Sequence, residues 1–411
     1  MKNTVKIPLK IALGVCVMGI IAFGLFYPGK GGALEELDKG VRENHPDPFT
    51  KVTEAEFDDA VSKLEQSWKE LGEVEDGRYY AMRRLVASLG DEHTSLAPSS
   101  RTSQPQLPFF VLSMEGSWIV VQAQKEYSGI VGKRLTAIND VTVDELRSLL
   151  LPLISHETDG WGEYQCSLEM RYLRNLRYIG VSDTLESVDI TVEDCRTKEV
   201  ETLTVEACKL GYNNTNSSMY AAIAPTLVQS GYYRAEAIED GVLFIQYNVC
   251  AQAPDLSMED FAQTLREQTS AAPPEKILID MRHNTGGDSN VITPLLALLG
   301  EYAEKGSELY CLTGSETFSS GVMNVLDLKE IGACIVGEST GGVMGFGELK
   351  TIRLSDGSRL YCSTKDFSQH YGFHDAVDPD VPVVQTVEDF LAGTDSVVSY
   401  ILENKTSFSS N

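Results

Sequence analysis

Short apolar runs alternate with segments of helical character from residue 219 onward, and this alternation limits the fold more than any other feature of the sequence. Each apolar run is long enough for one buried strand, and each segment between two runs has a helical period. The expected strands are 242–247, 276–281, 309–313 and 334–337, and the expected helices are 261–268, 291–299 and 321–331. Strands that alternate with helices predict crossover connections. We therefore expect an α/β domain over residues 213–405.

A helical domain is expected before it, over residues 32–103. One apolar stripe has steps of three and four residues, and a second helix is expected to stop at Gly90. Thr53 and Glu56 form a capping-box pattern, which fixes the start of the first helix. The stripe consists of Phe57, Val61, Leu64, Trp68 and Leu71.

Residues 104–212 predict a small α+β module between these two domains. Short strands are expected at 109–112, 118–122, 187–192 and 201–205, with a helix at 143–150. Polar segments at 99–105 and 213–218 mark the two ends of the module.

The first 31 residues predict a membrane anchor or a signal segment. Three lysines precede the apolar run 11–27, which would span about 26 Å as a helix. The basic flank should stay in the cytoplasm and send the following domains across. A cleaved signal peptide is the alternative, but no small-x-small cleavage site follows the run. We therefore favour an uncleaved anchor with an extracytoplasmic catalytic domain; cleavage would give a secreted protein.

The composition argues against several classes of partner and site. The 34 basic and 60 acidic residues give a net charge of −26, which repels nucleic acid. No C-x-x-C pair occurs among the 8 cysteines, and Cys16 in the leader leaves an odd number for the domains. His370 and His374 are four residues apart but lack a third ligand. We expect no metal, no cofactor and no complete disulfide framework.

Three segments contain residues that could carry chemistry. Gly286 and Gly287 follow an expected buried strand, where their N–H groups could receive an oxyanion, although an ordinary turn has the same pattern. Ser319 or Ser320 opens an expected helix, either as a nucleophile or as a simple N-cap. His93 follows a helix and could act as a base or merely complement the helix dipole.

Taken together, these segments resemble the tail-specific, or carboxy-terminal processing, serine peptidase family. The likeness is to its serine–histidine branch, which includes tricorn core and retinoid-binding-protein-like members. The motifs that carry it are RENHPDPF at 42–49, LGDEHT at 89–94, IDMRHNTGG at 279–287, TFSS at 317–320, VGESTGG at 336–342 and DPDV at 378–381. The resemblance implies an α/β catalytic core of the crotonase/ClpP-like ββα-spiral type.

The resemblance also implies roles for individual residues. Ser319 holds the place of the nucleophile and His93 that of the general base. Backbone N–H groups of Ser320 and of Gly286 or Gly287 would form the oxyanion hole.

The group that would orient the histidine departs from the family pattern, because Glu92 rather than a serine precedes His93. A carboxylate normally helps to orient the histidine, and the candidates here are Glu348, Asp375 and Glu92. Other members of the family use a lysine as the base. Lys350 lies slightly beyond the expected spacing, so His93 fits better.

The expected function is that of a membrane-anchored serine peptidase, which cleaves peptides or exported proteins through an acyl-enzyme. The alternative is a catalytically silent protein that binds a ligand or peptide on the same scaffold. Many relatives carry a PDZ domain in the middle region, and 132–140 with 143–150 resemble a PDZ strand and helix. No clear carboxylate-binding loop accompanies them. The expected partners are a peptide or protein substrate and, through the N-terminal segment, the membrane.

Overall fold

The structure is a computed structural model, and it describes residues 32–99, 104–208, 225–227, 229, 231–270 and 272–403. The expected leader at 11–27, with Cys16, lies outside the described residues, as does the polar boundary at 213–218. Among the residues that are described, no helix has both the length and the apolar character to cross a bilayer.

A six-stranded sheet forms the α/β part of the molecule, in the order β15-β12-β11-β10-β9-β8. All neighbours in it are parallel except β8, which pairs antiparallel with β9 at one edge. The strands are β8 (Tyr233–Glu239), β9 (Val242–Tyr247), β10 (Lys276–Asp280), β11 (Glu308–Thr313), β12 (Cys334–Gly337) and β15 (Val381–Pro382). The predicted alternation of strands and helices is confirmed.

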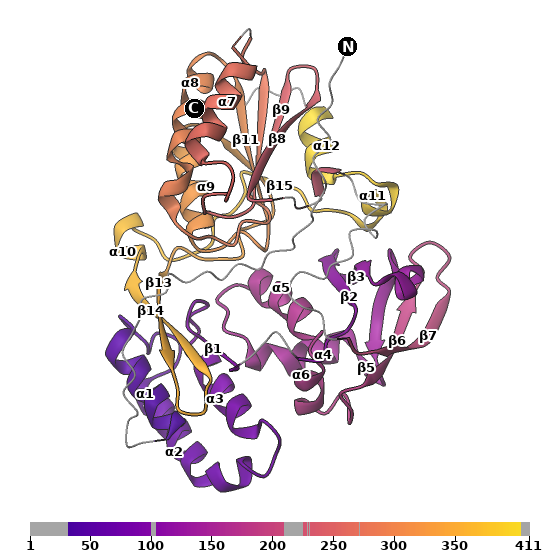
Figure 1. Ribbon diagram of the computed structural model, residues 1–411, viewed down its shortest axis with the longest axis vertical. Coiled ribbons are helices and arrows are strands. Elements are labelled where there is room, and N and C mark those ends of the chain that lie inside the picture. The colour runs from indigo at the N-terminus through magenta and orange to yellow at the C-terminus, as the bar shows by residue number, and fades with distance from the viewer. Residues whose placement is uncertain are drawn as a thin grey trace.

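Helices cover both faces of this sheet (Figure 1). One face packs against α7 (Met258–Gln268), α8 (Thr293–Glu304) and α9 (Ser320–Glu330), and the other against α12 (Ser396–Glu403). Burial on both faces explains why the sequences of β9, β10, β11 and β12 are largely apolar, whereas the edge strand β8 is partly exposed and carries charged residues. The Arg282 guanidinium joins the end of β10 to the start of α12, because it forms two-pronged hydrogen bonds with Asp280 and with Asp395 at 2.8–3.1 Å.

The middle region forms an antiparallel sheet in the order β2-β3-β4-β6-β7, with β5 paired to β4. Its strands are β2 (Phe109–Met114), β3 (Ser117–Ala123), β4 (Arg134–Ile138), β5 (Val141–Thr142), β6 (Ser187–Glu193) and β7 (Val200–Glu206). Its helices are α4 (Val143–Leu150), α5 (Asp159–Glu169) and α6 (Leu173–Tyr178). The four strands and the helix expected from the sequence are all present.

Three helices near the N-terminus share their core with a hairpin from the far end of the chain. They are α1 (Ala33–Asn44), α2 (Glu54–Leu71) and α3 (Gly77–Ala87), and the expected capping box of Thr53 and Glu56 opens α2. The hairpin, β13 (Phe346–Arg353) and β14 (Arg359–Asp366), pairs through β14 with β1 (Ser95–Ala97). Leu354, Leu360 and Cys362 join the helical core. The sequence predicts residues 346–366 as part of the α/β domain, whereas in the structure they pack against the N-terminal helices.

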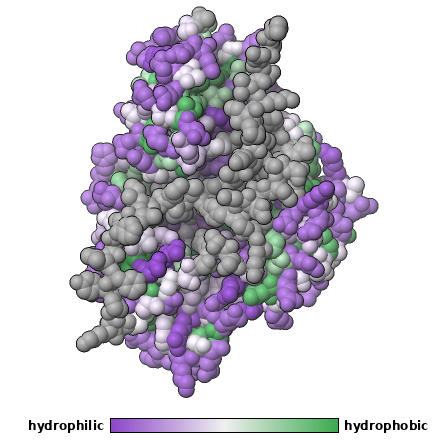
Figure 2. Space-filling model, in the orientation of Figure 1, coloured by the Kyte–Doolittle hydropathy of each residue, from purple (hydrophilic) through white to green (hydrophobic). Residues whose placement is uncertain are grey.

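The remaining helices, α10 (Ser368–Tyr371) and α11 (Val387–Ala392), lie on the chain between this hairpin and α12. On the face shown in Figure 2 the described surface is largely hydrophilic, with small separate apolar patches. The seven cysteines within the described residues are all free thiols.

Candidate active site

Ser319 occupies a strained position between β11 and α9. Its backbone has φ 55° and ψ −128°, a region that side-chain-bearing residues rarely adopt. Ser319 stands at the N-cap position of α9, but its hydroxyl makes no capping hydrogen bond. The Ser320 hydroxyl instead donates to Gly287 O at 2.7 Å. Neither serine therefore acts as an ordinary side-chain cap, and the strain at Ser319 is typical of a functional residue.

The loop that follows β10 lies directly against Ser319. A Cβ atom added to Gly286 would lie 2.6 Å from Ser319 Cβ and 2.9 Å from Ser320 N. Gly286 and Gly287 both have positive φ, at 97° and 137°, so this approach requires glycine at these positions. The structure thus brings the two predicted segments together at their glycines and serines.

The N–H groups at this point differ in their availability. Gly286 N–H donates to Asn284 Oδ1 at 3.0 Å. By contrast, neither Gly287 N–H nor Ser320 N–H donates a hydrogen bond to any residue that the structure describes. Of the two glycines that the sequence left open, Gly287 is the one with a free donor.

Buried hydrogen bonds hold the two loops in register. Thr317, which is fully buried, donates through Oγ1 to Met281 O at 3.0 Å, and Phe318 N–H donates to Asn284 O at 2.9 Å. An ion pair adds to them, since His283 Nδ1 lies 3.4 Å from Glu316 Oε2. The charge of Glu316 raises the pKa of His283, although burial acts in the opposite direction.

His93 reaches this site from the turn between α3 and β1. Its imidazole stacks on Phe318, the residue before Ser319, with ring centroids 4.4 Å apart and an interplanar angle of 24°. The side chain is buried, with 8% of the residue exposed. Neither ring nitrogen has a hydrogen-bond partner within the described part of the chain, so no hydrogen bond joins His93 to Ser319 in this state. Catalytic hydrogen bonds often tighten only when substrate is bound.

Asp91 is the carboxylate that organises the turn of His93, and the sequence reasoning did not single it out. It accepts hydrogen bonds from His93 N–H and His45 Nε2, both at 2.9 Å, and from the Thr94 hydroxyl. Burial opposes its charge, but these bonds and nearby His93 lower the pKa of Asp91 to about 2. Its position two residues before the histidine, where Asp commonly bonds its own backbone, was the available signal.

The electrostatic setting of His93 suits a proton acceptor. Burial lowers the pKa of His93 below its ordinary value, and the charge of Asp91 offsets only part of that effect. The imidazole is therefore neutral at pH 7, the form that a general base requires.

The three carboxylates considered from the sequence make other contacts. Glu92 Oε1 accepts Val343 N–H at 2.7 Å, and burial together with Glu157 raises its pKa well above the usual range. Glu348 pairs with Lys365, and its side chain is 55% exposed. Asp375 is exposed and accepts the N–H of the next residue. None of the three is bonded to the His93 ring.

Lys350 is also occupied elsewhere. Its ammonium group donates to Asn44 Oδ1 at 2.6 Å on the exposed side of β13. No group of three or more potential ligands among the described His, Cys, Asp and Glu residues could hold a metal ion.

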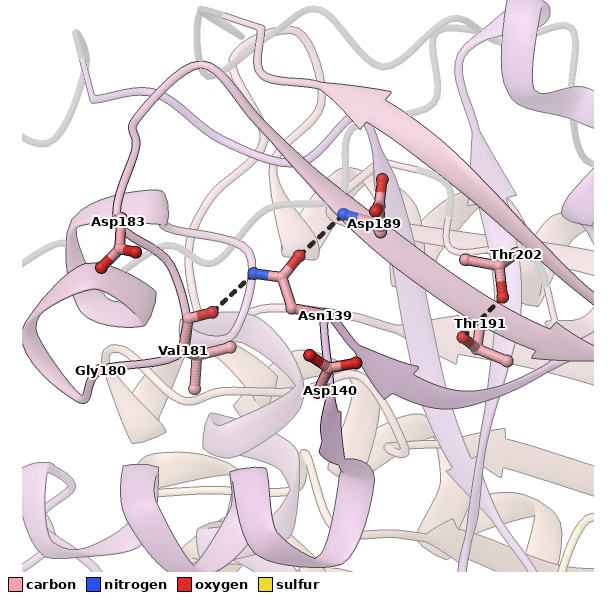
Figure 3. A pocket seen from close by; sticks show the side chains of 8 residues that line it. All are labelled: Asn139, Asp140, Gly180, Val181, Asp183, Asp189, Thr191 and Thr202. Carbon is pink, nitrogen blue, oxygen red and sulfur yellow. Dashed lines mark hydrogen bonds between the residues drawn. The ribbon is translucent and has the colours of Figure 1, made fainter.

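A polar pocket of about 450 Å³ lies in the middle module, and Figure 3 shows its lining. Three aspartates contribute to it, Asp140, Asp183 and Asp189. The Asn139 amide bridges its wall, because it donates to Val181 O and accepts Asp189 N–H. None of the candidate active-site residues lines this pocket.

Comparison with solved structures places the fold. Mature CPAF, solved in complex with lactacystin, matches with a TM-score of 0.63 and 13% identity, over 90% of this chain and 97% of that one. A structure described as a putative S41 protease from Bacteroides fragilis matches with a TM-score of 0.44 and 12% identity, over 93% of this chain and 98% of that one. The photosystem II D1 C-terminal processing protease matches with a TM-score of 0.39 and 15% identity, over 89% of this chain and 97% of that one. No protein-family model and no curated protein matches the sequence.

At such low identity the likeness to CPAF shows that the two chains share a mixed α/β fold over nearly their whole lengths. The other two scores are too low to add to that conclusion. Function must be argued from the site itself, because one fold hosts many activities.

Proposed function

We propose that this protein is a serine peptidase of the tail-specific type, with Ser319 as nucleophile and His93 as general base. One observation carries the proposal: a strained serine follows the phenylalanine on which a buried imidazole stacks, and within the described residues its hydroxyl and two backbone N–H groups beside it make no hydrogen bond. The family resemblance of the sequence motifs and the fold shared with CPAF support it.

The chemistry follows an acyl-enzyme route. His93 takes the proton from Ser319 Oγ as that oxygen attacks the scissile carbonyl. The N–H groups of Ser320 and Gly287 then receive the oxyanion of the tetrahedral intermediate. The imidazolium gives its proton to the leaving amine. A water molecule, activated in the same way, releases the acyl group and regenerates Ser319.

In this scheme Asp91 stabilises the imidazolium. Its carboxylate lies under the backbone of His93 and is the charged group that opposes the effect of burial on the ring. A nearby anion favours the protonated imidazole even without a bond to the ring.

We also propose that the catalytic part acts outside the cytoplasm, tethered by the segment 11–27, and that its substrates are peptides or exported proteins. The basic flank and the apolar run in the sequence support this location. The crotonase/ClpP-like assignment of the α/β part belongs to the same proposal.

Labelling with a fluorophosphonate tests the mechanism. The folded protein should be labelled at Ser319, and the Ser319→Ala and His93→Ala variants should lose labelling. Ser315→Ala, in the same loop, is the matched control and should label normally. A folded wild-type protein that resists labelling would favour the silent binding scaffold, for which the unbonded state of His93 is the supporting observation. Peptide binding that survives Ser319→Ala would then be the result to seek.

A further inference from the structure

We propose that Trp161, on the middle module, is a positioning residue for His93, and that the segment 155–161 clamps the histidine turn to the nucleophile loop. The inference rests on the function proposed above. It assigns to the middle module a direct part in the geometry of the site. Figure 1 shows α5, which begins within this segment, lying between the α/β part and the N-terminal helices.

Three hydrogen bonds connect the segment to different parts of the site. Ser155 donates through its hydroxyl to Thr94 O at 2.6 Å, one residue beyond His93. Glu157 Oε2 lies 2.7 Å from His374 Nε2. Thr158 donates to Gly341 O at 2.6 Å while it accepts Trp161 N–H at 3.0 Å as the cap of α5. The start of α5 is thus fixed to the site rather than to its own module alone.

The loop at Gly341 and Gly342 fits between this segment and the nucleophile. A Cβ atom on Gly342 would lie 2.9 Å from the Phe318 ring and 3.1 Å from Ser319 N. A Cβ atom on Gly341 would overlap Ser315 O and lie 3.3 Å from the Trp161 ring. The residues at this junction are closely packed, so a shift of Trp161 displaces the nucleophile loop as well.

Three aromatic rings are stacked in order from the middle module to the base. Trp161 lies on Phe318 with centroids 3.9 Å apart and planes 8° apart, and Phe318 lies on His93 at 4.4 Å. Trp161, Tyr164 and Phe318 form a small apolar cluster of their own, separate from the main cores. Trp161 supports Phe318 from the side opposite to the histidine.

Stacking matters here because the ring of His93 has no polar anchor. Both of its nitrogens are without a partner among the described residues, because Asp91 bonds to His93 only through the backbone N–H and Glu92 bonds to Val343. The plane and depth of the imidazole are therefore set by its aromatic neighbour. Removing the ring of Trp161 should loosen Phe318, misplace the base and admit water to it.

The test compares Trp161→Leu with Trp161→Phe. The leucine variant should lower the rate of Ser319 labelling about tenfold or more, and the phenylalanine variant, which can still stack, should restore most of it. Tyr164→Leu removes a ring of the same helix and cluster that lies against Trp161, with centroids 5.5 Å apart, but is not stacked on Phe318, and it should slow labelling less than Trp161→Leu does. Equal losses in Tyr164→Leu and Trp161→Leu, or no rescue by phenylalanine, would overturn the inference.

A second readout does not require activity. In the Ser319→Ala background, the pKa of His93 can be followed by NMR titration of its ring protons. Trp161→Leu should move this pKa upward, toward the ordinary histidine value, because water reaches the ring. An unchanged pKa would refute the positioning role even if the protein is no peptidase. Failure of wild-type labelling alone would count against the proposed function and leave this readout intact.

Discussion

Substitution of Gly286 by alanine should disable the candidate site at a single contact. The new Cβ would lie 2.6 Å from Ser319 Cβ and 3.0 Å from Phe318 O, whereas carbon atoms in contact stay about 3.5–4.0 Å apart. The nucleophile must therefore move by about 1 Å. A displacement of that size costs roughly 100-fold in rate, or about 2.7 kcal/mol of transition-state stabilisation.

Gly332 provides a closely matched control. Gly286 has φ 97° and Gly332 has φ 95°, so alanine brings similar backbone strain at both positions, of about 1–3 kcal/mol. A Cβ atom on Gly332, however, meets nothing within 4 Å. Urea denaturation should show a loss of stability in both variants, and the difference between them isolates the collision with Ser319.

The assay is the second-order rate constant of fluorophosphonate labelling, measured on folded protein at one pH. Gly286→Ala should react about 100 times more slowly than wild type, and Gly332→Ala at nearly the wild-type rate. If the two variants react equally fast, Ser319 does not depend on the packing of the glycine loop, and the assignment of this loop to the site is wrong.

Three further outcomes follow from the charges. The labelling rate should persist below pH 6.5 and fall only as the pH drops through the lowered pKa of His93; a midpoint at or above 6.5 contradicts a buried base. The pKa of His283 is raised in the folded state by its ion pair with Glu316. This pair therefore contributes its full stabilisation at pH values below the ordinary histidine pKa, and the stabilisation is lost as the pH rises through the raised pKa. The stability difference between wild type and His283→Gln, from urea denaturation, should shrink as the pH rises through the raised pKa of His283, and a constant difference argues against the pair. Arg282→Met leaves two buried carboxylates unpaired and should cost about 3–5 kcal/mol in the same assay, whereas a loss below about 1 kcal/mol would show them to be solvated or protonated.

Local patterns in the sequence predicted the elements well. The capping box at Thr53, the apolar strands of the parallel sheet and the helix after Ser320 all depend on near neighbours in the chain, which a sequence displays directly. The meeting of Gly286 with Ser319 was expected from the family motifs, not from these periodicities.

Features that depend on distant partners were missed. The hairpin β13–β14 has a mixed polar and apolar sequence. Its place beside α1 depends on contacts between residues more than 300 positions apart, such as the Leu360 side chain against Gly40. The stack of Trp161 on Phe318 likewise arises only when separate domains pack. No local period encodes such contacts.

The shared core of the N-terminal helices and the late hairpin has a consequence for biosynthesis. Ser363 N–H donates to Thr94 Oγ1 at 3.1 Å, so the turn of His93 is completed by a residue translated 269 positions after Thr94. A nascent or truncated chain that stops before β14 lacks a wall of this core and leaves apolar side chains of α1 uncovered. Under the proposed function, hydrolytic activity should therefore emerge only after the chain has been made through β14.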